Sequence, residues 1–312
     1  MVLGDQLRLY SFPHGHPFRS DRYDHFLQLL NSRSDLLNSG KVVLCQPRMA
    51  SREEVEMFHD SEYVEFVARA SKRGTGYLDY GDTPAFKGVY EASLWVVGAT
   101  LTALEAVMSG RAARAFNPVG GLHHARRDRA SGFCVFNDVA IAITAAIEVH
   151  GVKRVLYVDI DAHHGDGVFY GFYEDPRVWI FDVHEDGRYL YPGTGFRHER
   201  GAGDALGTKL NHPLPPGAGD EELLQAAEEL EAFASEASPE LIILQAGADG
   251  LASDPLTHLA YSVRGYVAMV SKVRELADRL CNGRLVAVGG GGYDRKALAA
   301  AWIGLVEELV RS

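Results

Sequence analysis

The sequence predicts an α/β fold in which a single parallel sheet is sandwiched between helices, and two observations predict it. Short apolar runs alternate with longer segments in which apolar residues recur at helical spacing. The polar and glycine-rich residues fall directly after the apolar runs rather than within them. Strands that alternate with helices form βαβ units, whose parallel sheet is covered by helices on both faces.

The strands are predicted from continuous apolar runs, which are typical of parallel strands buried on both faces. They lie at residues 41–45 (KVVLC), 114–119 (RAFNPV), 154–160 (RVLYVDI), 178–183 (VWIFDV), 241–247 (LIILQAG) and 284–290 (RLVAVGG). No low-complexity block, internal repeat or linker separates them, so a single domain is expected to span residues 1–312.

Helices are predicted over residues 88–110, 137–151, 219–238 and 263–283. The first segment has apolar residues at helical spacing and ends on a glycine, which is a common signal for the end of a helix. The side chain of Asn137 is suited to cap the second. The third begins with acidic residues, which stabilise the N-terminus of a helix.

The composition narrows the class of protein. With 46% hydrophobic and 23% charged residues, the chain resembles an ordinary globular protein. Acidic residues outnumber basic ones by 42 to 31, giving a formal net charge of −11, which argues against a general nucleic-acid-binding surface. Three cysteines at unrelated spacings predict neither a disulfide framework nor a zinc finger.

No signal for a membrane or an export pathway is found. The N-terminus lacks the basic start and the apolar core of a signal peptide. No stretch of about 18 uninterrupted apolar residues suggests a transmembrane helix. A cytoplasmic protein without membrane contact is therefore expected.

Polar clusters follow five of the apolar segments. They are GGLHH (120–124), DIDAHHGDG (159–167), DVHEDG (182–187), GADG (247–250) and GGGGYD (289–294). In parallel sheets, ligands bind outside the carboxyl ends of the strands. The clusters therefore predict one shared site at that edge of the sheet.

The central cluster predicts a metal site. Asp161 and His163 are separated by one residue in extended backbone, so both side chains point to the same side. Asp249, just past another apolar run, is the best third ligand, and three ligands leave a position open for water. Any one of these aspartates alone would more often be a turn former or helix cap. Two carboxylates and an imidazole suit Zn²⁺, and also Fe²⁺ and Mn²⁺.

The adjacent histidines His123 and His124 predict acid–base chemistry beside the metal. A histidine there can act as a general base and then protonate a leaving amine. Asp159 and Asp166 remain once the metal ligands are assigned, and they supply one carboxylate per histidine. Two His–Asp dyads are therefore expected.

Tyr293 follows four glycines, a run that lets the backbone approach a site closely. A phenol donor near a metal can stabilise a tetrahedral oxyanion. The alternative, a phosphate-binding loop, would need the lysine of GxxxxGK[ST] or the spacing GxGxxG, and neither pattern is present.

Five segments together resemble the metal-dependent histone deacetylase superfamily, which also includes acetylpolyamine amidohydrolases and the acetoin-utilisation proteins of prokaryotes. The segments are GGLHHARRDRASGFCVFND (120–138), YVDIDAHHGDGV (157–168), HEDGRYLYPGTGF (184–196), GADGLASDPL (247–256) and GGGGYD (289–294), in the order that the family has. The resemblance covers nearly the whole chain and is closest to prokaryotic-type members. It implies the arginase/deacetylase fold, with an eight-stranded parallel sheet and the active site at the carboxyl ends of the strands.

The resemblance also implies a reaction, the removal of acetyl or other acyl groups from lysine side chains of proteins by metal-activated water. Asp161, His163 and Asp249 would hold Zn²⁺, or alternatively Fe²⁺. The dyad of His124 and Asp166 would be the principal general base and acid, and the dyad of His123 and Asp159 would assist electrostatically. Tyr293 would hold the acyl oxygen.

Substrate-binding residues follow from the same resemblance. Phe133 and Tyr191 would form the walls of a tunnel for the acyl-lysine chain, and Gly132 would accept a hydrogen bond from the substrate amide. Leu256 and Asp82 would lie at the rim, where Asp82 would grip the substrate backbone, although an aspartate before Thr-Pro is equally suited to a turn. Arg19 would guard an internal exit for acetate.

A structural potassium ion is a further implication of the resemblance. Its ligands would be main-chain oxygens of Asp159, Asp161, His163 and Val183 and the side chain of Asp182. Two positions depart from the commoner family residues, because Asp182 stands where several relatives have serine and Tyr191 stands where phenylalanine is commoner. Asp166 keeps a carboxylate where one branch of the superfamily has asparagine.

Three alternatives remain beside lysine deacetylation of proteins. The first is the same chemistry on acetylpolyamines or other small acylated amines. The second is a catalytically silent scaffold, which should have lost a ligand or the tyrosine. The third is guanidine hydrolysis at a two-manganese centre, which would need further aspartates around a second ion. The physiological substrate, the acyl length, the native metal and the oligomeric state are left open by the sequence.

Overall fold

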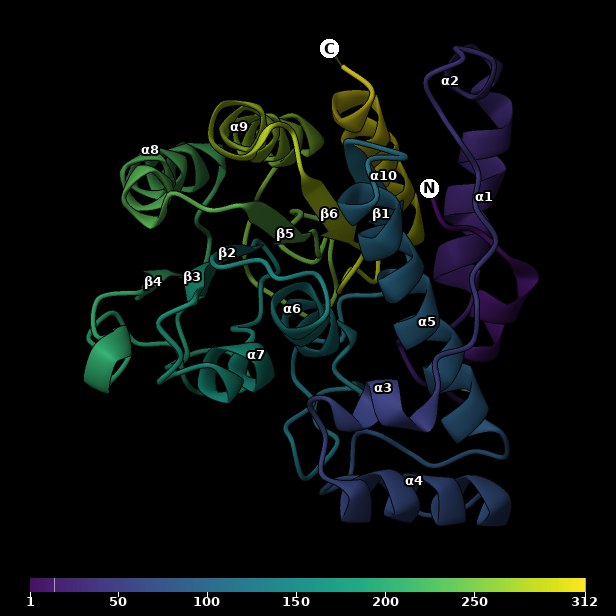
Figure 1. The fold of residues 1–312 in the computed structure, drawn as a ribbon. Coiled ribbons are helices and arrows are strands. Elements are labelled where there is room, and N and C mark those ends of the chain that lie inside the picture. The colour runs from purple at the N-terminus through teal and green to yellow at the C-terminus, as the bar shows by residue number, and fades with distance from the viewer. Residues whose placement is uncertain (14, 312) are drawn as a thin grey trace.

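A computed structural model describes residues 1–13 and 15–311, and at its centre lies one parallel sheet of six strands with helices on both faces (Figure 1). The strand order is β1-β6-β5-β2-β3-β4, and every neighbouring pair is parallel. The strands are β1 (Arg114–Asn117), β2 (Val155–Asp159), β3 (Val178–Glu185), β4 (Lys209–Leu214), β5 (Leu241–Gln245) and β6 (Leu285–Val288). The predicted α/β class is confirmed.

The helices form two layers around the sheet. Helices α8, α9 and α10 lie on one side, and α5, α6 and α7 lie on the other (Figure 1). Helix α1 packs against α10 beyond the β1 edge. The helices are η1 (Asp5–Leu9), α1 (Asp21–Ser32), α2 (Ser34–Leu37), α3 (Arg52–Glu56), α4 (Ser61–Arg73), α5 (Val89–Met108), α6 (Asp138–Glu148), α7 (Asp166–Gly171), η2 (Gly203–Ala205), α8 (Asp220–Ala237), α9 (Val263–Cys281) and α10 (Arg295–Leu309).

The four predicted helices correspond to α5, α6, α8 and α9, each trimmed at its ends. The side chain of Asn137 accepts a hydrogen bond from the Ala140 N–H over 2.9 Å, so it caps α6 as expected. Helix α5 is long and apolar enough to cross a membrane, but 72% of that stretch is buried inside the fold. It is a core helix.

The strand prediction was wrong at two places. The run 41–45 is not a strand, because only Cys45 makes a bridge, to Val2, while Val43 and Leu44 remain 64% and 55% exposed. Strand β4 was missed because its sequence KLNHPL is too polar to suggest a buried strand. It lies at the sheet edge, where it pairs only with β3 and where Pro213 is tolerated.

The strand count also differs from the eight implied by the resemblance, since the described residues form six. Beyond the β1 edge of the sheet, isolated residues make the pairing hydrogen bonds that further strands would make. The Val2 N–H donates to the carbonyl of Phe116 over 2.9 Å, and Val2 is bridged in turn to Cys45. Too few consecutive residues are paired there to form strands.

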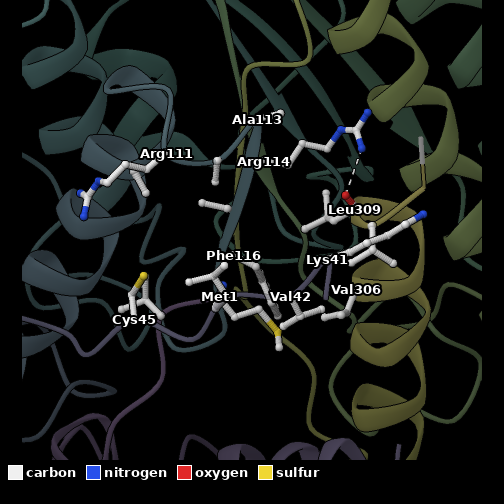
Figure 2. Close-up of a pocket in the computed structure, with 16 residues that line it drawn as sticks. Met1, Lys41, Val42, Cys45, Arg111, Ala113, Arg114, Phe116, Val306 and Leu309 are labelled. Carbon is white, nitrogen blue, oxygen red and sulfur yellow. Dashed lines mark hydrogen bonds between the residues drawn. The ribbon is translucent and has the colours of Figure 1, made fainter. Parts of the chain in front are cut away.

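A cavity of about 440 Å³ lies beside the amino end of β1, between α5 and α10 (Figure 2). Its walls are mostly apolar and include Val42, Phe116, Val306 and Leu309. Among the described residues, no histidine or carboxylate lines it. The polar clusters found in the sequence gather elsewhere, at the opposite end of the strands.

The buried strands explain where those clusters lie. Every residue of β2, β5 and β6 is buried because both faces of the sheet are covered. Buried polar side chains begin where these strands end, at Asp159 in β2 and Gln245 in β5. The loops that follow carry the candidate site.

Candidate active site

The loops at the carboxyl ends of the strands enclose a cavity of about 270 Å³. It brings together polar residues that lie far apart in the sequence. The lining residues that had been predicted are Asp82, His123, His124, Gly132, Phe133, Asp161, His163, Tyr191, Asp249, Leu256 and Tyr293. Asp159 and Asp166 lie behind the cavity, each in contact with one of its histidines.

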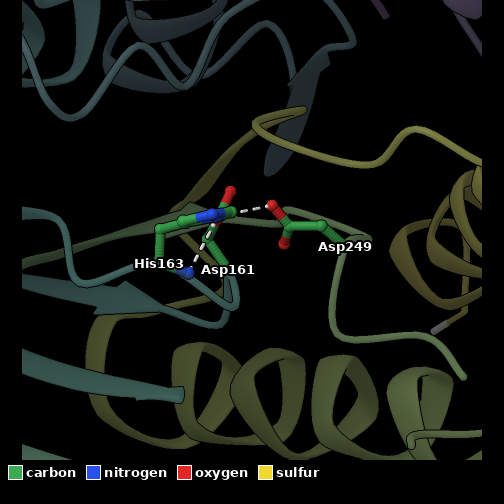
Figure 3. Close-up of side chains that lie close together, drawn as sticks. All are labelled: Asp161, His163 and Asp249. Carbon is green, nitrogen blue, oxygen red and sulfur yellow. Dashed lines mark hydrogen bonds and ion pairs between the residues drawn. The ribbon is translucent and has the colours of Figure 1, made fainter. Parts of the chain in front are cut away.

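Asp161, His163 and Asp249 converge as the sequence predicted (Figure 3). One ligand atom from each residue lies within 4.8 Å of the others, and all three residues are buried. Nδ1 of His163 is 3.2 Å from Oδ1 of Asp161 and 2.9 Å from Oδ2 of Asp249. Asp161 and His163 come from the loop after β2, and Asp249 comes from the loop after β5.

The hydrogen bonds at this cluster decide which oxygens face the ligand position. Oδ2 of Asp161 accepts hydrogen bonds from the Gly291 N–H and from Nε2 of Gln245, each over 2.8 Å. Oδ1 of Asp249 accepts one from the Ala162 N–H over 2.8 Å. The other oxygen of each carboxylate is turned toward Nδ1 of His163, and Oδ1 of Asp161 also accepts the backbone N–H of His163 over 3.0 Å.

The charges of the cluster fit a divalent cation. Burial disfavours a charged imidazole, but the Asp249 charge and the hydrogen bonds that the imidazole donates to both carboxylates outweigh it and raise the pKa of His163 to about 10. The two carboxylates favour a positive charge between them, and either a proton on Nδ1 of His163 or a divalent ion would supply it. A Cβ at Gly247 would clash with Asp161, and one at Gly291 would clash with Asp249. The O,O,N donor set and its glycine cradle fit Zn²⁺ and similar ions.

Both expected His–Asp dyads are present. Nδ1 of His123 is 2.7 Å from Oδ2 of Asp159, and Nδ1 of His124 is 2.8 Å from Oδ1 of Asp166. All four side chains are buried. The second dyad has an additional partner, since Nη2 of Arg126 donates to Oδ2 of Asp166 over 2.7 Å.

The two dyads differ in charge. For His123, the charges of Asp159 and Asp161 outweigh the cost of burial and raise the pKa of the imidazole to about 9. For His124, burial and the neighbouring charge of His123 lower the pKa to about 4, against the opposing effect of Asp166. The surroundings therefore favour a cationic His123 and a neutral His124.

Tyr293 lines the cavity at the end of the glycine run. Two of those glycines, Gly290 and Gly292, have φ angles of +81° and +120°, which L-residues rarely adopt. The backbone N–H of Tyr293 donates to Oδ2 of Asp254 over 2.6 Å, which fixes the start of its turn. The positive φ angles explain why this loop is made of glycine.

Sequence reasoning missed Arg22, which is 3% exposed and lies against the glycine run. Its Nε donates to the carbonyl of Gly292 over 2.7 Å and its Nη2 to that of Gly290 over 2.5 Å. Arg19 does not line the site cavity and instead borders, with Arg22, a separate cavity of about 10 Å³. Helical spacing could have identified Arg22, because it shares the buried face of α1 with Phe26 and Leu30.

Gln245 was also missed. Its buried amide donates through Nε2 to Asp161 Oδ2, and its Oε1 accepts from the Gly247 N–H over 2.7 Å. Its position in the sequence could have identified it, because Gln245 is a polar residue at the end of a buried strand, two positions before the GADG cluster. Its contacts place it directly behind a candidate metal ligand.

The predicted monovalent-cation ligands lie next to the first dyad. Asp182 and Val183 are in β3, and Asp182 is paired in register with Asp159 of β2. Oδ1 of Asp182 is 2.6 Å from Nδ1 of His184, and its Oδ2 accepts from the Gly165 N–H over 2.9 Å. Both carboxylate oxygens of Asp182 are thus already hydrogen-bonded within the protein.

Known proteins with similar sequences match this chain over most of its length. A family model described as the histone deacetylase domain matches residues 16–309. The acetoin utilization protein AcuC of Bacillus subtilis is 42% identical over 317 residues, covering 96% of this chain and 79% of that protein. A probable deacetylase of Archaeoglobus fulgidus is 38% identical over 282 residues, covering 89% of this chain and 76% of its own length.

Solved structures show the same architecture. The HD domain of HDA15 matches with a TM-score of 0.89 and 28% identity, covering all of this chain and 90% of that one. An HDAC homologue complexed with SAHA matches with a TM-score of 0.86 and 32% identity, covering 99% of this chain and 83% of its own.

Proposed function

The chain belongs to the histone deacetylase family and is a metal-dependent deacetylase, and we propose that it removes acyl groups from lysine side chains of proteins. The observation that carries the proposal is the arrangement in one cavity of a three-ligand metal cluster, a histidine paired with a carboxylate, and a tyrosine. These are the parts that amide hydrolysis requires.

Asp161, His163 and Asp249 would hold the divalent ion, whose chemistry is to polarise the acyl oxygen and to make a water molecule more acidic. We propose Zn²⁺ as the native ion, with Fe²⁺ as the alternative, because the O,O,N donor set accepts both. Among the described residues, only this one cluster offers three metal ligands, which disfavours hydrolysis of a guanidine at a two-manganese centre.

His124 would act as the general base and then as the acid. It is neutral at neutral pH, so its Nε2 lone pair can take a proton from water and later return it to the leaving amine. Asp166 accepts the Nδ1–H and holds the ring in the tautomer with a lone pair at Nε2, which accepts the Nε2–H of His123 until it takes the proton from water. The cationic His123 would stabilise negative charge that develops beside it.

Tyr293 would donate a hydrogen bond to the acyl oxygen. Burial raises the pKa of its phenol well above the usual value, so the group keeps its proton at neutral pH. Phe133 and Tyr191 would flank the substrate chain, and Gly132 would accept a hydrogen bond from the scissile amide. The amine leaves as the product with the acid, acetate, as its co-product.

A lysine carried by a protein is the preferred substrate because the mouth of the cavity is open. The wall residue Tyr191 is 42% exposed, and the rim residue Asp82 is exposed as well. We propose a structural potassium ion beside the first dyad, as the resemblance implies. The feature against a strong site is that both carboxylate oxygens of Asp182 are already hydrogen-bonded, to His184 and to Gly165.

The substrate assignment is tested by comparing kcat/KM for an acetyl-lysine peptide with that for acetylputrescine, using protein reconstituted with Zn²⁺ or Fe²⁺. We expect the peptide to be hydrolysed faster with either metal. A clear preference for the diamine would assign the protein to small acylated amines instead. The variant Asp161→Asn serves as the control for contaminating hydrolases, since it removes a proposed metal ligand.

A further inference from the structure

One wall of the cavity is a tight turn from Ser131 to Cys134. The N–H of each of these two residues donates to the carbonyl of the other, over 3.1 Å and 2.8 Å. The central residues, Gly132 and Phe133, have φ angles of +53° and +68°. Glycine adopts such angles readily, but phenylalanine does so only when its surroundings hold it there.

Phe133 is held by hydrogen bonds at both of its main-chain groups. Its N–H donates to Oγ1 of Thr83 over 3.0 Å, and its carbonyl accepts from the Tyr10 hydroxyl over 2.7 Å. Thr83 is fully buried although it is separated from Phe133 by 50 positions in the sequence. The unfavourable backbone conformation of this wall residue therefore depends on a side chain from a different loop.

The same hydroxyl contacts the rim. Oγ1 of Thr83 donates to Oδ1 of Asp82 over 3.1 Å. A hydroxyl has one hydrogen, so donating it to Asp82 leaves a lone pair to accept the N–H of Phe133. Asp79 fixes this loop, because its Oδ1 accepts the N–H groups of Gly81, Asp82 and Thr83.

The ring of Phe133 faces groups that define the width of the cavity. Its centroid lies 6.1 Å from that of Tyr293 and 4.5 Å from that of His16, both in edge-on contact. His16 also hydrogen-bonds the Asp82 carbonyl through Nε2, over 3.0 Å. A shift of the turn would move Phe133 relative to the tyrosine that holds the acyl oxygen.

From these contacts we infer that Thr83 is a positioning residue that couples the rim carboxylate of Asp82 to the wall residue Phe133. The inference rests on the proposed function of the cavity. Binding of a substrate whose backbone N–H groups contact Asp82 would depend on this coupling. Binding of a small acylated amine, which has no peptide backbone, would not. Thr83 would thus favour peptide-linked acyl-lysine over small amines.

The test is the variant Thr83→Val, which keeps the side-chain shape and removes the hydroxyl. We expect KM for an acetyl-lysine peptide to rise about tenfold, the size expected for losing one hydrogen bond, and any change in kcat caused by movement of Phe133 to be the same for a peptide and a small amine. KM for N-acetylbutylamine, which has no backbone N–H to offer Asp82, should rise clearly less than KM for the peptide. Thr83→Ser should restore the peptide KM.

The matched control is Thr102→Val, in which the lost hydroxyl bonds only the Gly98 carbonyl within α5. A thermal unfolding midpoint for each variant separates folding from binding. If Thr83→Val does not fold, Thr83→Ala makes the same test without adding a methyl group next to Asp82. A peptide KM equal to wild type in the folded variant, or equal losses for both substrates, would overturn the inference.

Failure of the proposed function is distinguishable from failure of this inference. If the wild-type protein hydrolyses neither substrate, the proposed function fails before any variant is compared. If wild type is active, the double variant Asp82→Asn/Thr83→Val should raise the peptide KM by less than the product of the two single effects. Independent effects would show that Thr83 does not act through Asp82.

Discussion

Nε2 of His123 lies 3.1 Å from Nε2 of His124, so the two imidazoles share one hydrogen between them. Each Nδ1 already faces a carboxylate and carries its own hydrogen. A hydrogen bond between the two Nε2 atoms then needs one N–H and one lone pair. His123 supplies the N–H as a cation, and His124 supplies the lone pair as a neutral ring.

This assignment predicts the effect of removing His124. We expect His124→Ala to lower kcat about 10²-fold or more, the size associated with a lost proton carrier, and to leave the metal content unchanged. The measurement is steady-state hydrolysis of an acetyl-lysine peptide together with elemental analysis. His25→Ala, an exposed histidine on α1, is the control. Near-normal turnover in His124→Ala would contradict the assigned role.

Tyr293→Phe should also lower kcat about 10²-fold, because it removes one donor to the developing oxyanion. Tyr261→Phe is a matched control, since the buried Tyr261 hydroxyl has no hydrogen-bond partner among the described residues and its loss should be neutral. Circular dichroism would verify that both variants are folded. Equal rates for the two variants would remove Tyr293 from the mechanism.

Metal removal should abolish activity. We expect about one divalent ion per chain, because one three-ligand cluster is present in the described part of the protein. Dialysis against a chelator should stop hydrolysis, and Zn²⁺ or Fe²⁺ should restore it. Two ions per chain, or hydrolysis that persists after complete chelation, would be incompatible with this site.

Gln245→Leu should weaken metal binding, because the amide donates to the oxygen of Asp161 that does not face the ligand position. Loss of such an outer hydrogen bond typically costs about 10- to 100-fold in metal affinity. Competition with a fluorescent chelator would measure the dissociation constant independently of activity. Gln225→Leu, an exposed position on α8, is the control. Unchanged affinity in Gln245→Leu would show that Asp161 needs no such support.

Acid should destabilise the protein partly through His59. Burial lowers the pKa of this imidazole to about 4, whereas an unfolded histidine has a pKa of about 6.5. The unfolded chain therefore binds the proton first as the pH falls, and the folded state loses about 2 kcal/mol of stability from this group between pH 7 and pH 4.5.

Urea unfolding of wild type and His59→Gln at these two pH values checks that prediction. Glutamine can accept the Asn137 N–H that Nε2 of His59 accepts over 2.8 Å, but it does not titrate. The variant should lose less stability than wild type on acidification. Parallel losses would show that His59 is not a source of the acid sensitivity.

The fold class followed from local pattern alone. Continuous apolar runs in β2, β5 and β6 predicted buried strands because such strands are covered on both faces. The pattern failed at the edges of the sheet. Residues 41–45 are apolar yet exposed, and β4 is polar yet paired, because pairing at an edge depends on which segment lies alongside.

The sequence by itself determined which residue types follow each strand, and hence that Asp161, His163 and Asp249 would meet at one edge of a parallel sheet. Only the tertiary structure decided which carboxylate oxygens face the ligand position and which histidine is neutral. The reason is physical. The charge of a buried group is set by its desolvation and by neighbours that are distant in the sequence, and no local pattern encodes either.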